Sequence, residues 1–189
     1  MFDPITNFDL SILEAIQRTM KCAFLDKVMP MITALGNAGI FWIIIAVVML
    51  FFKKTRKTGL MMGCALVLGL LFGNLTLKPL IARIRPYDLP GINIDLLVEK
   101  SSEIYSFPSG HTLASFEGAT VLMIRDKRLG IPALVVAALI AFSRLYLYFH
   151  YPTDIVGGII LGVLFGILGC LIVNKGFAFY EKKKVNTSL

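Results

Sequence analysis

Five apolar stretches, separated by short charged breaks, dominate the chain. They occupy residues 40–52, 59–77, 112–124, 131–149 and 155–173. The second stretch has 19 residues, and a helix of that length extends about 28 Å, close to the hydrocarbon thickness of a bilayer. The pattern predicts an all-α fold, a polytopic transmembrane helical bundle with five spans, or with six if the N-terminal region also crosses.

The N-terminal region follows a different pattern. Residues 8–22 carry most of their charged side chains away from one helical face, which is formed by Phe8, Ile12, Ala15, Ile16 and Thr19. Because this segment is too charged to span, we expect an amphipathic helix that lies in the membrane interface or covers the bundle. Residues 24–36 are moderately apolar, and the pattern leaves open whether they form a short helix or a re-entrant segment.

The composition is typical of an integral membrane protein. Hydrophobic residues make up 57% of the 189 residues and the mean hydropathy is +0.77, whereas soluble domains contain roughly 45–50% apolar residues. The chain has no linker-like or low-complexity stretch. Residues 1–189 are therefore expected to form a single membrane-embedded domain.

The net charge of +7 comes from clusters placed between the apolar stretches, at residues 53–57, 125–128 and 175–184. If each stretch spans once, all three clusters lie on the same side of the membrane, and an excess of Lys and Arg marks that side as cytoplasmic. This pattern argues against a nucleic-acid partner. It predicts a multi-pass protein of the cell membrane with a cytoplasmic C-terminus, and a 78–110 loop that faces the extracytoplasmic side.

Three polar segments converge on the predicted outer side. The first, KPLIARIRP at residues 78–86, contains Lys78 and Arg85. Cations at the mouth of a bundle, opposite the basic cytoplasmic loops, indicate an anionic ligand, and the planar arginine fork matches phosphate oxygens. Arg83 and Lys100 are expected to face solvent or lipid headgroups instead.

The second segment is Pro108-Ser109-Gly110-His111, directly before an apolar stretch. Backbone N–H groups at a helix start, with a glycine that permits close approach, can bind an anion. Ser109 can add a hydroxyl donor or serve only as the N-cap of the helix. His111 is placed where it could donate a proton to a leaving oxygen.

The third segment, residues 143–154, places Arg144, His150 and Asp154 in otherwise apolar and aromatic sequence. Ionisable groups are costly there and indicate a functional site. A carboxylate bonded to one ring nitrogen of His150 would fix the tautomer and leave the other nitrogen free to attack. Pro152 suits the first turn of the last span, so Asp154 would lie at its beginning.

Together the three segments resemble the signature of the type 2 phosphatidic acid phosphatase (PAP2) superfamily, which has the form Lys78-x6-Arg85-Pro86, Pro108-Ser109-Gly110-His111 and Ser143-Arg144-x5-His150-x3-Asp154. The resemblance implies that His150 attacks phosphorus, that Asp154 holds its imidazole and that His111 protonates the leaving oxygen. It also implies that the phosphoryl oxygens are bound by Lys78, Arg85, Ser109, Gly110 and Arg144.

The same resemblance implies a lipid phosphate or diphosphate substrate that enters from the membrane, no cofactor and no metal. Undecaprenyl diphosphate is the leading substrate, with phosphatidylglycerophosphate or phosphatidate as alternatives. We expect the acidic residues of the outer loop, Asp88, Asp95, Glu99 and Glu103, to be solvated. The oligomeric state stays open.

A transporter or binding protein for anionic lipid is the alternative from another class. It explains the cations but gives no reason for a histidine four residues before Asp154. The role of Glu117 is also open, although helical periodicity places it on a different face from His111.

Overall fold

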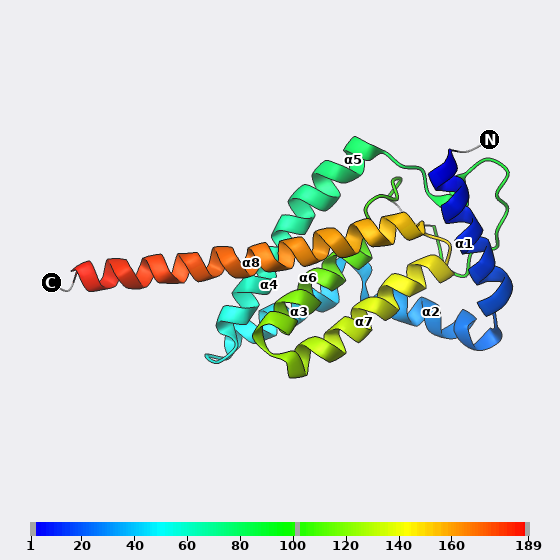
Figure 1. Ribbon diagram of the computed structural model, residues 1–189. Coiled ribbons are helices and arrows are strands. Elements are labelled where there is room, and N and C mark those ends of the chain that lie inside the picture. The colour runs from blue at the N-terminus through cyan, green and yellow to red at the C-terminus, as the bar shows by residue number, and fades with distance from the viewer. Residues whose placement is uncertain (1–2, 101–102, 188–189) are drawn as a thin grey trace.

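The computed structural model describes residues 3–100 and 103–187, and these residues form an array of helices (Figure 1). The α-helices are α1 (Pro4–Met20), α2 (Ala23–Leu35), α3 (Ile40–Phe51), α4 (Arg56–Leu68), α5 (Lys78–Ile81), α6 (Gly110–Arg125), α7 (Lys127–Tyr146) and α8 (Pro152–Thr187). Short 3₁₀ helices, η1 (Asn37–Gly39) and η3 (Pro86–Asp88), and a π-helix, η2 (Gly69–Leu77), lie between them. Within the described ranges the only β pairing is an isolated bridge between Ile84 and Tyr105. The predicted all-α class is confirmed.

Helix α6 lies at the centre of the bundle, where it contacts α3, α4, α7 and α8. Small residues allow this close packing. A Cβ atom on Gly162 of α8 would lie 2.7 Å from the carbonyl oxygen of Leu113, and one on Gly118 would lie 2.3 Å from the Trp42 ring. Gly158, Gly162 and Gly166 of α8, which closely approach α6, therefore serve helix packing, as small residues commonly do within membranes.

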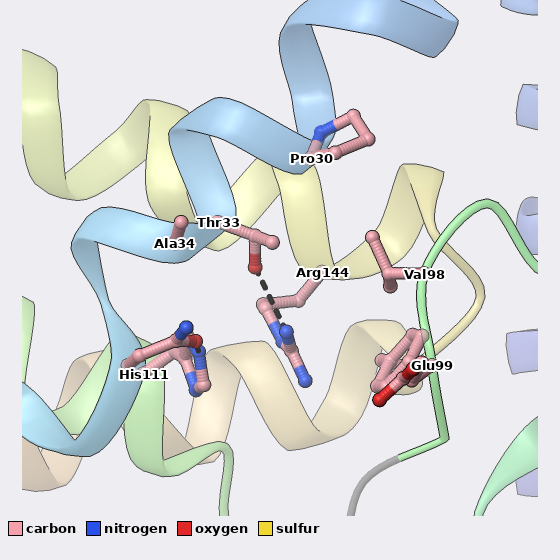
Figure 2. Close-up of a pocket in the computed structure, with 9 residues that line it drawn as sticks. Pro30, Thr33, Ala34, Val98, Glu99, His111 and Arg144 are labelled. Atoms are coloured by element: carbon pink, nitrogen blue, oxygen red, sulfur yellow. Dashed lines mark hydrogen bonds between the residues drawn. The ribbon is translucent and has the colours of Figure 1, made fainter.

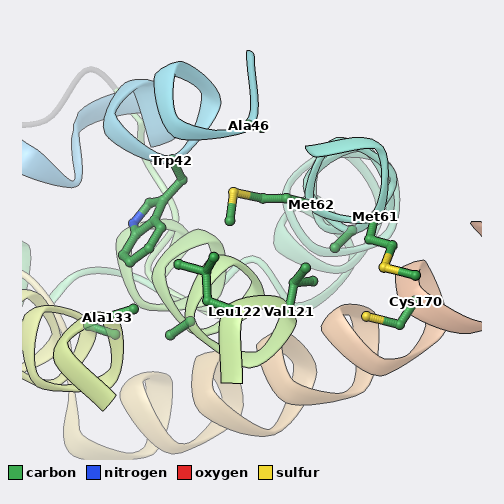
Figure 3. Close-up of a cluster of buried hydrophobic side chains, with 11 residues drawn as sticks. Trp42, Ala46, Met61, Met62, Val121, Leu122, Ala133 and Cys170 are labelled. Atoms are coloured by element: carbon green, nitrogen blue, oxygen red, sulfur yellow. The ribbon is translucent and has the colours of Figure 1, made fainter. Parts of the chain in front are cut away.

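An apolar cluster fills the space around α6 (Figure 3). It joins α3, α4, α6, α7 and α8 through Trp42, Ala46, Met61, Met62, Ala65, Ala119, Val121, Leu122, Ala133, Ala137 and Cys170. The one polar group of Trp42 is satisfied, because its Nε1 donates to Ser115 Oγ at 3.0 Å. This core fixes the rotation of α6 and hence the direction in which its N-terminal residues point.

Three helical segments are long and apolar enough to cross a membrane: Arg56–Ile81, Lys127–Tyr146 and Pro152–Lys183. The pair Ala23–Leu35 and Asn37–Phe51, bent by 41°, would make a fourth. Their exposed apolar side chains, such as Ile44, Val67 and Ile160, suit contact with lipid. The protein is thus a membrane protein with three or four candidate spans by length and composition, and this criterion does not confirm the predicted five or six. Helix α6 does not qualify because it has only 16 residues.

Helices α1 and α2 cover the end of the bundle near the last turn of α7. The buried face of α1 consists of Asp9, Leu10, Leu13 and Ile16. The predicted apolar face was therefore partly wrong, since Phe8 is exposed and Asp9 is fully buried. The segment at residues 24–36 is helical, and the break after it contains two successive residues with positive φ, Ala38 and Gly39.

The basic clusters gather at one end of the bundle. Arg125 Nε donates to Thr58 Oγ1 at 3.3 Å, and the Lys57 ammonium lies 5.2 Å from the centre of the Phe177 ring. The α3–α4 and α6–α7 turns lie at this end, whereas α1 and the irregular segment between α5 and α6 lie at the other (Figure 1). That irregular segment begins after Ile81, later than the expected boundary at residue 78, because the helix continues through α5.

Candidate active site

His150 lies in the tight turn between α7 and α8 and is 1% exposed. Helix α8 begins at Pro152, as predicted, so Asp154 sits in its first turn. The distance from His150 Nδ1 to Asp154 Oδ2 is 3.4 Å. The same Oδ2 accepts from the backbone N–H of Tyr151 at 2.9 Å, so the carboxylate is held in place from the turn itself.

Arg85 approaches the opposite side of the imidazole. Its Nη1 lies 3.3 Å from His150 Nε2 and donates to the Phe149 carbonyl at 3.1 Å, and its Nε donates to the Glu103 carbonyl at 2.8 Å. A guanidinium can only donate, so Nε2 acts as the acceptor and the ring proton lies on Nδ1, toward Asp154. His150 is therefore held as a neutral tautomer with a basic nitrogen facing a cation.

The environment of His150 strongly favours this neutral form. Complete burial, followed by the positive charges of Arg144, Arg85 and Lys78, lowers the pKa of His150 well below its usual 6.5. The lone pair on Nε2 is thus available near neutral pH, which a nucleophile or a general base requires.

Lys78 and Arg85 share an anionic partner, the Glu103 carboxylate. Lys78 Nζ forms an ion pair with Glu103 Oε2, and Arg85 Nη2 lies 3.4 Å from the same oxygen. The prediction that Glu103 is merely solvated was wrong, because although its side chain is 55% exposed, its tip reaches both cations. A carboxylate held here indicates that this position accepts anionic oxygens.

Arg144 and His111 line a cavity of about 430 Å³ that also includes Thr33, Asn37 and Glu99 (Figure 2). Arg144 Nη1 donates to Thr33 Oγ1 at 2.8 Å, and its guanidinium lies 4.5 Å from the centre of the Phe149 ring. Its Nε is buried without a hydrogen-bond partner among the described residues. An unused donor on a buried cation suits an anionic ligand, since such a group is costly to leave unpaired.

His111 occupies the first turn of α6 and faces this cavity (Figure 2). Its Nε2 lies 3.0 Å from Asn37 Oδ1, and because a carboxamide oxygen only accepts, this nitrogen carries a proton. The structure thus brings both histidines to the same end of the bundle, with Arg144 near each of them. Asn37 was not singled out from the sequence.

Ser109 and Gly110 form the start of α6. Ser109 is the N-cap, and its Oγ accepts from the Thr112 N–H at 3.4 Å and from Thr112 Oγ1 at 3.0 Å. A hydroxyl in this role can still donate its own proton. The Ser109 N–H donates to the Asp154 carbonyl at 3.3 Å, which ties the start of α6 to the start of α8. A Cβ on Gly110 would lie 3.0 Å from Asn74 Oδ1.

Arg83, which was expected to face solvent or headgroups, is instead held within the site, and that prediction was wrong. Its Nη1 lies 2.7 Å from Asp154 Oδ1 and its Nη2 lies 2.7 Å from Asp9 Oδ2. Asp9 was missed altogether. The available signal was its spacing, because Asp9, Leu13 and Ile16 share one helical face.

Residues 58–177 match the PAP2 superfamily. The chain belongs to this family. The match spans more than half of the chain and includes all three polar segments, so the resemblance found in the sequence is confirmed.

Curated relatives of this PAP2 chain include named phosphatases of lipids. An undecaprenyl-diphosphatase of Sulfolobus acidocaldarius is 32% identical over 82% of this chain and 73% of its own length. Phosphatidylglycerophosphatase B of Bacillus subtilis is 33% identical over 84% of this chain and 82% of its own length. The substrates in these names are those of the two relatives.

Solved structures share the fold. The transmembrane PAP2-type phosphatidylglycerolphosphate phosphatase from Bacillus subtilis has a TM-score of 0.72 at 30% identity, covering 95% of this chain and 88% of its own. Aquifex aeolicus LpxE has a TM-score of 0.74 at 26% identity, covering 86% and 94%. The helical arrangement described above is therefore that of a PAP2 membrane protein.

Proposed function

We propose that this PAP2 protein hydrolyses a lipid phosphate or diphosphate through a phosphohistidine intermediate on His150. One observation carries the proposal: His150 is held between Asp154 at Nδ1 and Arg85 at Nε2, beside the buried cations Lys78 and Arg144. A neutral, oriented imidazole facing clustered positive charge is suited to attack on a phosphoryl group. A site that only bound the anion would not require a neutral, oriented imidazole.

The proposed reaction has two steps. In the first, His150 Nε2 attacks phosphorus, the bond from phosphorus to the leaving oxygen breaks, and His111, acting as the imidazolium, gives that oxygen a proton and becomes neutral. In the second, His111 accepts a proton from water, which attacks the phosphohistidine, and phosphate leaves as the bond to Nε2 breaks. Lys78, Arg85 and Arg144 stabilise the charge on the phosphoryl oxygens in both steps.

The remaining donors complete a site that we propose works without a metal. Ser109 and the Gly110 N–H, at the N-terminus of α6, would bind the phosphoryl oxygens further. The charge that a metal ion would supply in other phosphoryl-transfer enzymes is supplied here by three side-chain cations. No cluster of three or more potential metal ligands occurs in residues 3–100 and 103–187.

We propose undecaprenyl diphosphate as the substrate, with undecaprenyl phosphate as the product. Phosphatidylglycerophosphate is the second candidate, since the relatives include proteins named for each activity at nearly equal identity. The active site would lie on the extracytoplasmic side, because the basic turns gather at the opposite end. The short α6, about 24 Å long, would place His111 below the outer surface, where a lipid phosphate can arrive with its tail in the bilayer.

The test is phosphate release by the purified protein from undecaprenyl diphosphate, phosphatidylglycerophosphate and phosphatidate, with EDTA present throughout. We expect release from at least one substrate, and a His150→Ala variant that binds the lipid but releases no phosphate. Continued hydrolysis by that variant would refute the mechanism. Binding without hydrolysis by the native chain would favour a transporter or binding protein, and inhibition by EDTA would contradict the metal-free route.

A further inference from the structure

Arg83 is not a specified position of the three motifs, yet its guanidinium pairs with Asp154, the carboxylate that faces His150. Nη1 donates to Asp154 Oδ1 at 2.7 Å and to Thr153 Oγ1 at 2.6 Å, and Nη2 donates to Asp9 Oδ2 at 2.7 Å. The guanidinium plane also lies 3.8 Å from the centre of the Tyr151 ring. Hydrogen bonds and stacking thus fix Arg83 in one orientation.

Asp9 provides the second half of this arrangement from a distant part of the chain. Its side chain has no solvent exposure, although α1 is otherwise a peripheral helix. Besides pairing with Arg83, it accepts from the backbone N–H of Thr153 at 3.1 Å and from the Thr153 hydroxyl. Asp9 therefore satisfies a free N–H in the first turn of α8, where a helix has no internal acceptors.

The geometry points to Arg83 and Asp9 as positioning residues that hold the Asp154 carboxylate and, through it, the His150 imidazole. The inference deepens the proposed function and rests on it. Asp154 Oδ1 is fixed by Arg83, and this leaves Oδ2 directed at His150 Nδ1 and the Tyr151 N–H. Rotation of the carboxylate would release the imidazole from its attacking orientation.

Charge explains why an arginine is required here. Asp9 and Asp154 are both completely buried, and an unpaired buried carboxylate is strongly unfavourable. The two ends of one guanidinium fork reach the two carboxylates separately, whereas a lysine ammonium offers a single point charge. Arg83 thereby links α1, the segment after α5 and the first turn of α8 around the turn that carries His150.

The test compares kinetics of Arg83→Met, Arg83→Lys and Asp9→Asn with the native chain on its best lipid phosphate. We expect Arg83→Met to lower kcat about 10- to 100-fold, as small misplacements of reacting groups commonly do. KM should change less than about threefold, because Lys78, Arg85 and Arg144 still bind the phosphoryl group. Arg83→Lys should recover part of the loss, and Asp9→Asn should lose less than Arg83→Met.

A matched control comes from the exposed pair of Lys100 and Asp88, whose N–O distance is 2.6 Å. Lys100→Met removes a cation from the same segment and should leave kcat unchanged. The double variant of Asp9→Asn and Arg83→Met should be no slower than Arg83→Met alone, because the two residues act as one unit. If the double variant instead showed the product of the two single losses in kcat, Asp9 and Arg83 would not act as one unit.

The pH profile separates positioning from packing. Arg83→Met leaves the other titratable and charged groups near His150 unsubstituted, namely Lys78, Arg85, Arg144, His111 and the Glu103 carboxylate. Without the Arg83 cation, the pair of His150 and Asp154 should take up a proton at higher pH. The acid limb of kcat/KM should therefore move to higher pH, which a loss of packing alone would not cause.

Each outcome bears on one proposal. Native kcat and an unmoved acid limb in Arg83→Met would overturn the positioning role while leaving the proposed function intact, provided that His150→Ala is inactive. Absence of phosphate release from the native chain would instead refute the proposed function. If Arg83→Met fails to fold, Arg83→Lys and Asp9→Asn carry the same test, and native kcat with a native pH profile in both would refute the inference.

Discussion

Among single residues, His150 shows most directly how the fold prepares a reactive group. Burial and three neighbouring cations keep its imidazole neutral, and Asp154 and Arg85 set which nitrogen carries the proton. A histidine in water would be protonated in part near neutral pH. The neutral form of His150 depends on neighbours from three separate segments of the chain.

The lowered pKa of His150 predicts the pH dependence of the reaction. In the proposed reaction the neutral imidazole is the nucleophile, and this form is lost only when the pH falls through a pKa that lies well below 6.5. The acid limb of kcat/KM, which reports the free enzyme, should therefore fall below pH 6.5 for the native chain. Measuring phosphate release from about pH 4 to about pH 8, in steps of about half a pH unit, checks this prediction. A limb centred at or above pH 6.5 would contradict it.

Glu103 predicts a change in anion affinity. A phosphoryl group that binds Lys78 and Arg85 must replace the Glu103 carboxylate. Glu103→Gln should therefore tighten inhibition by inorganic phosphate about twofold to fivefold, which corresponds to the roughly 0.5–1 kcal/mol of a partly exposed ion pair. Asp95→Asn, an equal charge change at an exposed position of the same segment, should leave inhibition unchanged. Weaker inhibition in Glu103→Gln would contradict this role.

The motif spacing identified the residues that meet at the site but not all of their partners. His150 and Asp154 are four residues apart, so local geometry was enough to pair them. Arg83, Asp9 and Glu103 meet the site only through the path of the irregular segment and the docking of α1. Helical spacing could have indicated that Asp9 is buried, but it gives no signal for a partner such as Arg83, which is 74 positions away.

At the level of the helices, the position of α6 controls the site. Its first turn carries His111 and its N-cap Ser109 is bonded to the Asp154 carbonyl, while α8 packs closely along its length. The sequence predicted the helices from their apolar runs, but α6 fails a length criterion for spanning. It can be short because neighbouring helices surround it and bury most of its residues.

Close packing of α8 on α6 predicts the effect of adding a methyl group. In Gly162→Ala the new Cβ would lie 2.7 Å from the Leu113 carbonyl oxygen, which is backbone and cannot move aside easily. We expect a loss of about 1–3 kcal/mol in stability, typical of overpacking. Gly63→Ala is the matched control, because no atom lies within 4 Å of its added Cβ. Thermal unfolding in detergent checks both, and equal stabilities would contradict the packing.

At the level of the whole molecule, the basic clusters between the apolar stretches and the candidate active site lie at opposite ends. Arg125 and Lys57 mark the basic end, and α1 covers the other (Figure 1). The general arrangement could be predicted because each charged break follows an apolar run. The number of spans stays a prediction, because hydropathy and length alone do not assign the bent pair α2 and α3 or the short α6.

Cysteine labelling tests the proposed orientation. Cys22 is exposed at the end of the molecule that carries α1, whereas Lys127 begins α7 at the basic end. A membrane-impermeant thiol reagent should label Cys22 in intact cells, and Cys22→Ser should remove that label. In the Cys22→Ser background, Lys127→Cys should be labelled only after lysis. The reverse pattern would place the active site on the cytoplasmic side.

Trapping the intermediate tests most directly whether His150 carries the phosphoryl group. The native protein is mixed with a lipid substrate bearing a radiolabelled terminal phosphate, quenched within milliseconds and mapped by mass spectrometry. We expect an acid-labile label on His150 that is absent in His150→Ala. Label on another residue, or turnover by the native chain with no phosphoenzyme at any quench time, would contradict it.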